Sequence, residues 1–599
     1  MIYKNETDEA RDLLRKVQTY WEEGVAAMKH RRAKWKNNYA WWVNMKLSGQ
    51  RPTYKSDIRI NYCFVTTQTK IPIITQNQPT VNFVPYNPDD EESARTLSKL
   101  VGNALWNKLE IQDTFQDVAW NSCVYDNGFY KIGWDPDEDE MFVKSIEPFK
   151  LIPDPMADKI DSCRYIFHVE PYAVSHLKVL YPDFADKIKA DPAISSVLFE
   201  ERRSADRKAT SQAISTDTEY AIERAYKKEA WLTEAAFLAE VEESYDEAGK
   251  KKKRKRNKYP NGLLVTMIND DLIVDVKENP NPWKFPFVKS AMNKVGNEFW
   301  DMGDIEQVIP LQQGLNHITQ QLADIVNKVA NVGWTVHPNV GEENIRKLAQ
   351  ALQKPGALKP IAPEYLKADD PPQVPAILVR MQQEYIQRIF DVTGISDILQ
   401  GSGRVTHRTA RGIERLYEAG ASRIGQSVRN HENALKKVFL MMGDLAIKFY
   451  KEERFYPLLG GQGTLEGILQ IPDGALSGKF EASIDSGATL PQDKKARAEL
   501  ALELFTGGVL EMAAAGDPAH KEIARMVLQA VEFPGRERLL AVPTAPPETP
   551  PLQQPPAGPG ESLPPEVEQM AAAAGVSPEE LLMMISGQPQ GAAGVPNVG

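Results

Sequence analysis

The chain contains only three cysteines in 599 residues, Cys63, Cys123 and Cys163, and they stand far apart. Their separation provides neither the framework of a disulfide-stabilised domain nor the paired spacing of a zinc site. We therefore expect free thiols, a reducing compartment and no structural zinc.

Long apolar runs are also missing. The longest, such as "VFLMM" at 438–442, are far shorter than the roughly 20 residues that cross a bilayer. The opening "MIYKNETDEARD" has no apolar signal region. The sequence predicts a soluble protein without a membrane partner.

The motifs of common catalytic sites are absent. A phosphate-binding loop needs serine or threonine after its lysine, but Gly478-Lys479 is followed by Phe480. His168 and Glu170 have the His-x-Glu spacing of zinc deaminases, yet no paired cysteines follow, so His168 is interpreted as a buried strand histidine. Neither Gly-x-Ser-x-Gly nor His-Glu-x-x-His occurs. We predict that the chain is no enzyme and needs no cofactor.

An acidic cluster between two strand-like segments resembles the start of a calcium loop. Asp135, Asp137 and Asp139 alternate as calcium ligands do, but Glu140 replaces the glycine required at the sixth position. Ile146 replaces the glutamate required at the twelfth. A solvated connection between two strands of a hairpin is the better interpretation.

Charge is unevenly distributed. The net charge of -11 argues against a surface that coats nucleic acid, because such binding depends on phosphate neutralisation by lysine and arginine. One basic run interrupts this acidic background and is typical of an exposed loop, which we favour, of a phosphate-binding patch or of a nuclear address. The run comprises Lys250, Lys251, Lys252, Lys253, Arg254, Lys255 and Arg256.

The first half of the chain mixes helices with strands. Apolar spacing predicts a long helix from about Thr7 to Leu47, with Gly24 as a candidate break, and a further helical stretch from Ala94 to Asn121. Aromatic and β-branched residues in "GFYKIGW" predict a strand, and strands alternate with polar connections from Tyr165 to Phe287. A β-rich region is therefore expected before residue 300.

The second half is dominated by three predicted helices. Apolar residues from Ile305 to Val329 step by three and four without a miss, and further helices are predicted for Ala376–Val392 and Thr409–Glu452. A proline-rich, non-helical section is predicted between Gly333 and Pro375. Helices this long need partners along their apolar stripes, and neighbouring subunits are a natural source.

The order of these segments resembles the portal proteins of tailed bacteriophages, most closely the larger portals of short-tailed phages. The matching segments are "IRIN", "QNQPTVNFVP", "VYDNGFYKIGWDP", "IEPFKLIPDP", "WKFPFV", "GDIEQVIPLQQGLN" and "VTGISDILQG". The resemblance covers about Tyr20 to Gly535, and its specific part is the order of the segments.

The resemblance implies an α+β, mainly helical fold, in which each subunit has a β-rich wing, long stem helices, a clip, a tunnel loop and a helical crown. In the tunnel loop, residues Gln400, Gly401, Ser402, Gly403, Arg404, Val405, Thr406 and His407 would face DNA. The implied boundaries are 1–302 for N-terminal helices and wing, 303–331 for the first stem helix, 332–375 for the clip, 376–395 for the second stem helix, 396–408 for the tunnel loop, 409–485 for a long wing helix and strand, 486–540 for the crown, and 541–599 for a proline-rich, disordered tail with a short helix.

The resemblance also implies a function. The family forms a homo-oligomeric ring, usually of twelve copies, through which double-stranded DNA is packaged and ejected at one capsid vertex of the virion. Assembly would take place in the host cytoplasm, with a terminase motor, a tail adaptor, capsid and scaffolding proteins as partners. The alternative is a cytoplasmic nucleic-acid-binding scaffold that uses the basic run at 250–256.

Overall fold

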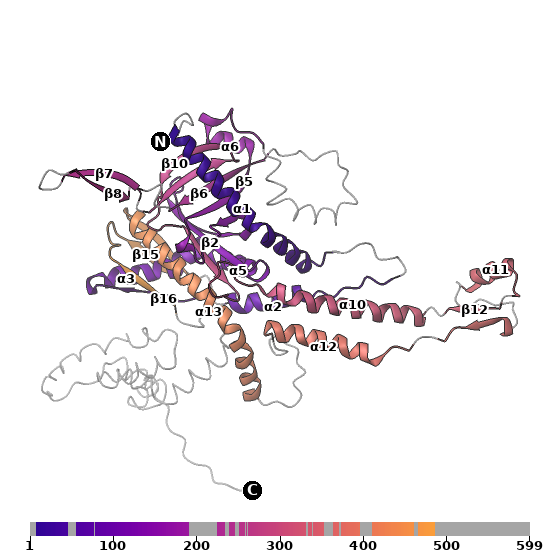
Figure 1. The fold of residues 1–599 in the computed structure, drawn as a ribbon. Coiled ribbons are helices and arrows are strands. Elements are labelled where there is room, and N and C mark those ends of the chain that lie inside the picture. Colours follow the sequence, from indigo (N-terminus) through magenta and orange to yellow (C-terminus); the bar gives the residue numbers. More distant parts are fainter. Residues whose placement is uncertain are drawn as a thin grey trace, which may run out of the picture. The chain divides into compact units, whose positions relative to one another are not determined.

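The computed structural model describes most of the first 484 residues (Figure 1). The chain divides into two units, 1–491 and 492–599, and all described residues lie in the first. The predicted tunnel loop, crown and tail lie outside the described residues. Those described are 8–45, 55–76, 78–190, 224–233, 239–245, 251–257, 259, 261–330, 333–337, 339–352, 363–370, 373–395, 410–459 and 465–484.

The described elements alternate between helix and strand in the first half and are mainly helical afterwards. The helices are α1 (Asp8–Trp42), α2 (Tyr62–Thr75), α3 (Glu91–Lys99), α4 (Trp106–Lys108), α5 (Ile111–Val124), α6 (Val174–Leu180), α10 (Asp304–Ala330), α11 (Glu342–Leu352), α12 (Ala376–Thr393) and α13 (Ala410–Phe449). The strands are β1 (Val81–Pro85), β2 (Asn127–Asp135), β3 (Glu140–Ile146), β4 (Leu151–Pro153), β5 (Tyr165–Ala173), β6 (Arg224–Leu232), β7 (Ala239–Tyr245), β8 (Lys251–Asn257), β9 (Leu263–Ile268), β10 (Leu272–Glu278), β11 (Phe287–Ala291), β12 (Trp334–Val336), β13 (Leu366–Ala368), β14 (Arg454–Leu459), β15 (Leu465–Ile471) and β16 (Phe480–Ile484).

A five-stranded antiparallel sheet carries the first core. Its order is β10-β9-β6-β5-β4, and α1 packs across it (Figure 1). Gly24 lies where α1 meets β4, since a Cβ at this position would approach Ile152 Cγ2 to 2.5 Å. The predicted break at Gly24 is therefore wrong: α1 is continuous, and the glycine permits close contact with the sheet.

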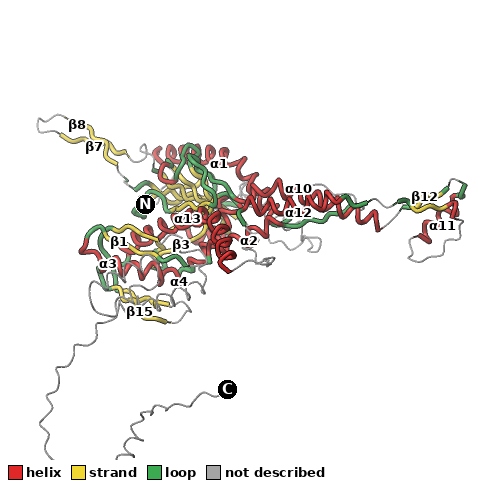
Figure 2. Tube along the Cα trace, turned by 90° about the horizontal axis from the view of Figure 1, so that it is seen from below, coloured by secondary structure: helices red, strands yellow, loops and turns green. Residues whose placement is uncertain are grey.

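A second core forms around α13. The three-stranded sheet β11-β2-β3 and helix α5 pack with α13, and β1 pairs with β16 nearly 400 residues later, with Phe83 opposite Ala482. Figure 2 shows α13, β1 and β3 together at one end of the α10–α12 pair. The described part is therefore a mixed α+β structure, as the sequence predicted.

Helices α10 and α12 run side by side, and the short antiparallel pair β12–β13 lies with α11 beyond their ends (Figures 1 and 2). The non-helical section predicted from Gly333 to Pro375 is wrong at α11, which is a helix with Glu342 and Glu343 in its first turn. Acidic residues at this end favour a helix because they complement its dipole. The stretch predicted as one helix from Ala94 to Asn121 is also interrupted, at Glu110, where the backbone is left-handed with φ of 49°.

Candidate functional site

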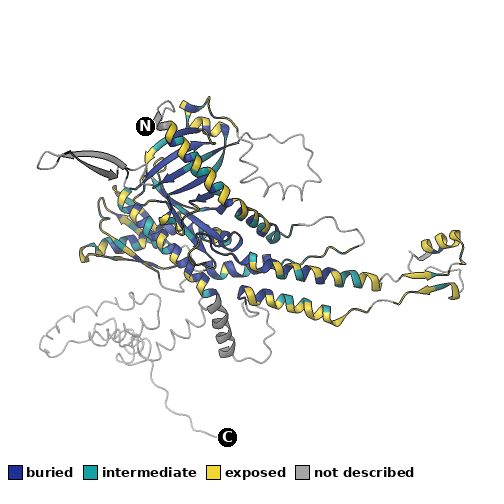
Figure 3. Ribbon diagram, viewed as in Figure 1, coloured by how far each residue is buried: buried dark blue, intermediate teal, exposed yellow. Residues whose placement is uncertain are grey.

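The apolar stripe of α10 is only partly covered. Val308 and Leu315 are fully buried, but exposure rises along the helix and reaches 53% at Val326 (Figure 3). The stripe was correctly predicted from its spacing, and its far end lacks a covering element in the described part of the chain. Such apolar surface in water favours association.

An extended segment, residues 55–61, lies along α10 and is called the strap here. Polar side chains of α10 bond to the strap and to the first residue of α2, which explains why Gln312 and Asn316 are buried polar residues. The bonds are Ser56 N to Asp324 Oδ1 (2.6 Å), Ile60 N to Asn316 Oδ1 (3.4 Å), Tyr62 N to Gln312 Oε1 (3.0 Å), Gln312 Nε2 to Ile60 O (2.5 Å) and Asn327 Nδ2 to Ser56 Oγ (3.0 Å).

The strap and the start of α2 present apolar side chains to solvent. We call the set Ile58, Ile60, Phe64 and Val65 the strap face; each is more than one-third exposed. On α12, a second exposed apolar set shares one side of the helix, because its members are four and eleven residues apart. We call this set, Ile377, Met381 and Val392, the α12 face.

Lysines from three different elements hold the start of α10. Lys70 of α2 bonds to Asp304 at 2.7 Å, and Lys289 of β11 lies 2.9 Å from Asp301. Lys34 of α1 pairs with Glu306. Carboxylates in a first turn also complement the helix dipole. This arrangement fixes α10 to both cores, and the sequence did not reveal it because Lys34 and Lys70 lie far from their partners in the chain.

Asp126 also holds the start of α10 in place, through hydrogen bonds of its carboxylate. Its buried carboxylate accepts hydrogen bonds from Trp35 Nε1 at 2.9 Å and from Lys34 Nζ at 3.2 Å, both on α1. Its other oxygen accepts from Gly303 N at 3.3 Å, one residue before α10. Asp126 therefore links α1 directly to the start of α10.

The three cysteines are all buried and unpaired. Burial raises the pKa of each thiol, at Cys63, Cys123 and Cys163, to about 12. The thiolate, which is the reactive form, is therefore scarce at neutral pH. These side chains are core residues rather than nucleophiles.

His168 lies on β5 and is buried, as predicted. Its Nδ1 lies 3.1 Å from Lys131 Nζ, and the same lysine bonds to Glu229 at 2.6 Å. Burial, followed by the charge of Lys131, lowers the pKa of His168. Within the described residues no three His, Cys, Asp or Glu side chains are arranged to hold a metal ion.

The acidic cluster joins β2 to β3, with Asp135 opposite Glu140, so the predicted hairpin is confirmed. Glu140, however, is not simply solvated: it accepts a hydrogen bond from Tyr456 at 3.2 Å and also contacts Lys108 and Tyr450. The hairpin end is thereby attached to the end of α13 and to β14.

The basic run is a strand rather than the predicted loop. Residues 251–256 lie in β8, which pairs with β7, an acidic strand. The Cα register places Glu240 opposite Arg256 and Glu242 opposite Arg254. Opposite charges across a strand pair favour pairing, so acidic partners explain why a run of like charge forms a strand. Lys250 lies outside the described residues.

Replacing residues 234–258 by a short Gly/Ser linker is expected to leave the thermal midpoint and oligomeric state unchanged. Among the described strands β7 and β8 pair only with each other, whereas Leu232 and Leu263, on either side of the insertion, already pair in the five-stranded sheet. Differential scanning fluorimetry and size-exclusion chromatography would measure both properties. Loss of assembly would identify the β7–β8 hairpin as an interface, and loss of DNA affinity would support the scaffold alternative.

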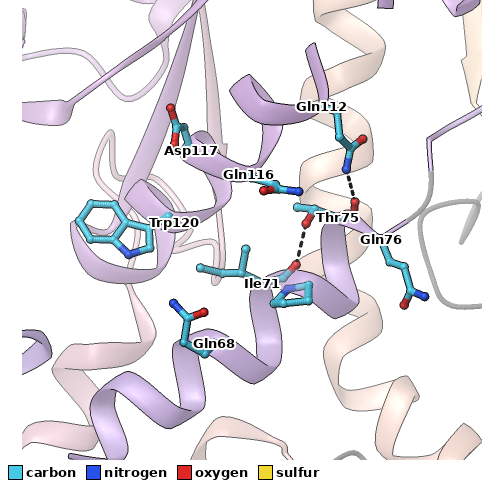
Figure 4. Close-up of a pocket in the computed structure, with 9 residues that line it drawn as sticks. Gln68, Ile71, Thr75, Gln76, Gln112, Gln116, Asp117 and Trp120 are labelled. Atoms are coloured by element: carbon cyan, nitrogen blue, oxygen red, sulfur yellow. Dashed lines mark hydrogen bonds between the residues drawn. The ribbon is translucent and has the colours of Figure 1, made fainter. Parts of the chain in front are cut away.

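Two hollows of about 360 Å³ occur among the described residues. One lies between α2 and α5 and is lined by four glutamines, among them Gln68 and Gln116, and by other residues that include Ile71 and Trp120 (Figure 4). Burial, with the nearby carboxylates of Asp113 and Glu147, raises the pKa of Asp117 at its rim. The lining contains no Ser, Cys or His, and its one hydroxyl, Thr75 Oγ1, donates a hydrogen bond to the Ile71 carbonyl oxygen at 3.0 Å.

The second hollow lies between α1 and the loops after β4 and β11. Asp154, the buried carboxylate in its wall, is already paired with Arg164 at 2.7 Å and 2.8 Å. The candidate functional features of the described part are its surfaces, namely the strap face and the α12 face, together with the fixed start of α10. The predicted site residues Gln400–His407 lie outside the described residues.

The comparisons with known proteins bear on the family of the chain. No described helix is both long and apolar enough to cross a membrane. A search of curated proteins found no match. The family model described as phage P22-like portal protein matches residues 60–593, which is most of the chain. The chain therefore belongs to the phage P22-like portal protein family.

Proposed function

We propose that copies of this chain form a closed ring of twelve subunits, the number typical of portals, around a channel for double-stranded DNA. The observation that carries this proposal is the exposed apolar surface of the α10–α12 pair, including Val326 and Ile377, which a single chain leaves in water. Neighbouring copies cover such surfaces without leaving open edges when a repeated contact closes on itself.

The acidic net charge of the chain fits a channel through which DNA passes without being bound tightly. The net charge of -11 supports this proposal, because an acidic channel wall would repel phosphate and let the duplex pass without strong binding. In this proposal the ring is a structural protein at a capsid vertex of the virion, built in the host cytoplasm with capsid and scaffolding proteins. A separate terminase supplies the chemical energy for packaging, and the same channel serves ejection.

The proposal assigns a role to each part of the chain. A loop at 396–408 extends into the channel, where Arg404 and His407 touch phosphates without reading sequence. The β12–β13 end of the helix pair meets the terminase and the tail adaptor. The remaining assignments are 1–302 and 409–485 for the wing, 303–331 and 376–395 for the stem, 332–375 for the clip and 486–540 for the crown.

Electron microscopy of the purified full-length protein tests the proposal. Closed rings with a central channel are expected. A monodisperse monomer at micromolar concentration, or an open filament, would contradict it.

A further inference from the structure

We propose that the hollow between α2 and α5 is a binding site for an extended, proline-rich polypeptide segment. This site goes beyond the ring proposed above and does not depend on it. The residues around the hollow combine carboxamide side chains with an aromatic ring and include no lysine or arginine (Figure 4). A phosphate backbone requires cationic side chains, so the lining favours a ligand that is recognised by neutral hydrogen bonds and apolar contact.

Glutamines on both helices supply the hydrogen-bonding groups. Gln68 of α2 and Gln116 of α5 are exposed, so their carboxamides are accessible from solvent. Gln112 instead donates through Nε2 to the Thr75 carbonyl oxygen and thereby joins the two helices. Because a carboxamide carries both an N–H donor and a carbonyl acceptor, the exposed glutamines can bond to the backbone of a polypeptide.

A row of three aromatic rings borders the hollow. Phe64 of α2 and Trp42 of α1 have ring centroids 5.7 Å apart, and Trp42 and Trp120 of α5 have centroids 5.1 Å apart. Phe64 is exposed and both tryptophans are half-buried. Aromatic-lined grooves bind proline-rich segments in the polyproline II conformation. One turn of that helix, three residues at about 3.1 Å each, is comparable in length to the two ring-to-ring steps of this row.

A polyproline II segment matches both features of the hollow. It makes no internal hydrogen bonds, so its carbonyl groups remain free to accept from the amides of Gln68 and Gln116. Its proline rings offer apolar surface to Trp120. An α-helical ligand would use its carbonyl groups within its own helix and leave the glutamine amides without partners.

The acidic rim sets the charge of the ligand. Asp117 lies in the lining, and Asp113 precedes it by one turn of α5. These carboxylates disfavour an acidic segment. The sequence of the chain contains a run of suitable chemistry, "PPLQQPP" at 550–556, which has four prolines and no charged residue. This run supplies the sequence of a probe.

Fluorescence anisotropy of a labelled synthetic peptide tests the site. The peptide has the sequence of residues 549–559, "TPPLQQPPAGP", and is titrated with the full-length protein. Saturable binding is expected. The double variant Gln68→Ala/Gln116→Ala should weaken the binding about tenfold, because two neutral hydrogen bonds to the peptide are lost. Both positions are exposed on helices and alanine favours helix, so the variant should keep its fold.

Three controls separate this site from other causes of binding. The matched variant Gln307→Ala/Gln470→Ala removes two exposed glutamines outside the hollow and should bind the peptide as the unchanged protein does. A peptide with alanine in place of proline should bind at least about tenfold more weakly, because its backbone is no longer held extended. Since the protein contains the same run, the titration is repeated on a full-length variant whose four prolines at 550–556 are replaced by serine, which removes competition.

Several outcomes would overturn the proposal. One is the absence of saturable binding to both the unchanged protein and the serine variant at millimolar peptide. Another is equal affinity of the unchanged protein and Gln68→Ala/Gln116→Ala. Displacement of the peptide by maltohexaose would assign the hollow to neutral glycans, which amides and an indole ring also suit. None of these readouts requires a ring, so their failure would leave the proposed function standing.

Discussion

Replacing Lys70 by methionine is expected to lower the free energy of unfolding by about 3–5 kcal/mol, the range for breaking a buried ion pair. Lys70 and Asp304 are both buried, and their atoms Nζ and Oδ2 lie 2.7 Å apart. Without the lysine, the Asp304 carboxylate keeps only the hydrogen bond from Asn293 Nδ2 at 2.8 Å. A desolvated charge without its partner then remains at the start of α10.

Guanidinium denaturation followed by tryptophan fluorescence, at fixed protein concentration, measures this loss. The matched control is Arg95→Met on α3, which removes an exposed pair with Glu91 and should cost at most about 1 kcal/mol. The double variant Lys70→Met/Asp304→Asn, which also removes the acidic charge, should recover part of the stability. Equal unfolding midpoints for Lys70→Met and Arg95→Met would show that the buried Lys70–Asp304 ion pair stabilises the fold no more than an exposed pair does.

The elements that sequence could predict are those whose signal is local. The stripe of α10, the strand β2 and the hairpin between β2 and β3 each carry their periodicity or turn residues within a short segment. Family membership was likewise accessible, because the order of many weak segments is more specific than any one of them. The fold class and the portal assignment therefore followed from the chain itself.

The features that sequence missed depend on distant partners. The strap has no periodicity, and its backbone is bonded by side chains about 250 residues later, such as Gln312. Gly24 suggested a helix break because its propensity is poor, yet the contact with Ile152 explains why a glycine is there. The basic run suggested a loop because runs of charged residues usually lie in exposed loops, and only the register with β7 reveals its acidic partners.

The position of the strap on α10 likewise could not be predicted from the sequence. Spacing predicted that α10 needs a covering partner, but it could not tell which side the strap would occupy. The position of the strap is set by amide residues of α10, including Asn316, that resemble ordinary surface residues in the sequence. The strap and α12 both pack on α10, and each leaves apolar side chains such as Ile58 and Ile377 exposed.

Acidification is expected to lower the stability of the fold because of the buried His431. His431 of α13 is fully buried, with Nδ1 2.8 Å from the Ser427 carbonyl oxygen and Nε2 3.1 Å from Ser122 Oγ. Burial is the main cause that lowers its pKa from 6.5 to about 4, although the bond to Ser427 opposes the shift. The folded chain therefore keeps this ring neutral at a pH where the unfolded chain binds a proton.

The sign of the effect follows from the lowered pKa. The contribution of His431 is complete above the unfolded pKa of 6.5 and is lost as the pH falls toward 4. Between pH 7 and pH 5 the loss should be about 2 kcal/mol from this residue. The buried His168, whose pKa is also lowered, adds a loss of the same sign.

Denaturant titrations at several pH values, on the chain and on His431→Asn, isolate the contribution of this one residue. The variant should be less stable at pH 7 but should lose less stability on acidification, so the two curves converge toward pH 5. His176→Asn on the exposed side of α6 is the matched control and should keep the original slope. Parallel curves for the chain and His431→Asn would show that His431 is not held neutral by burial, because only a group with different pKa values in the folded and unfolded chain changes the slope.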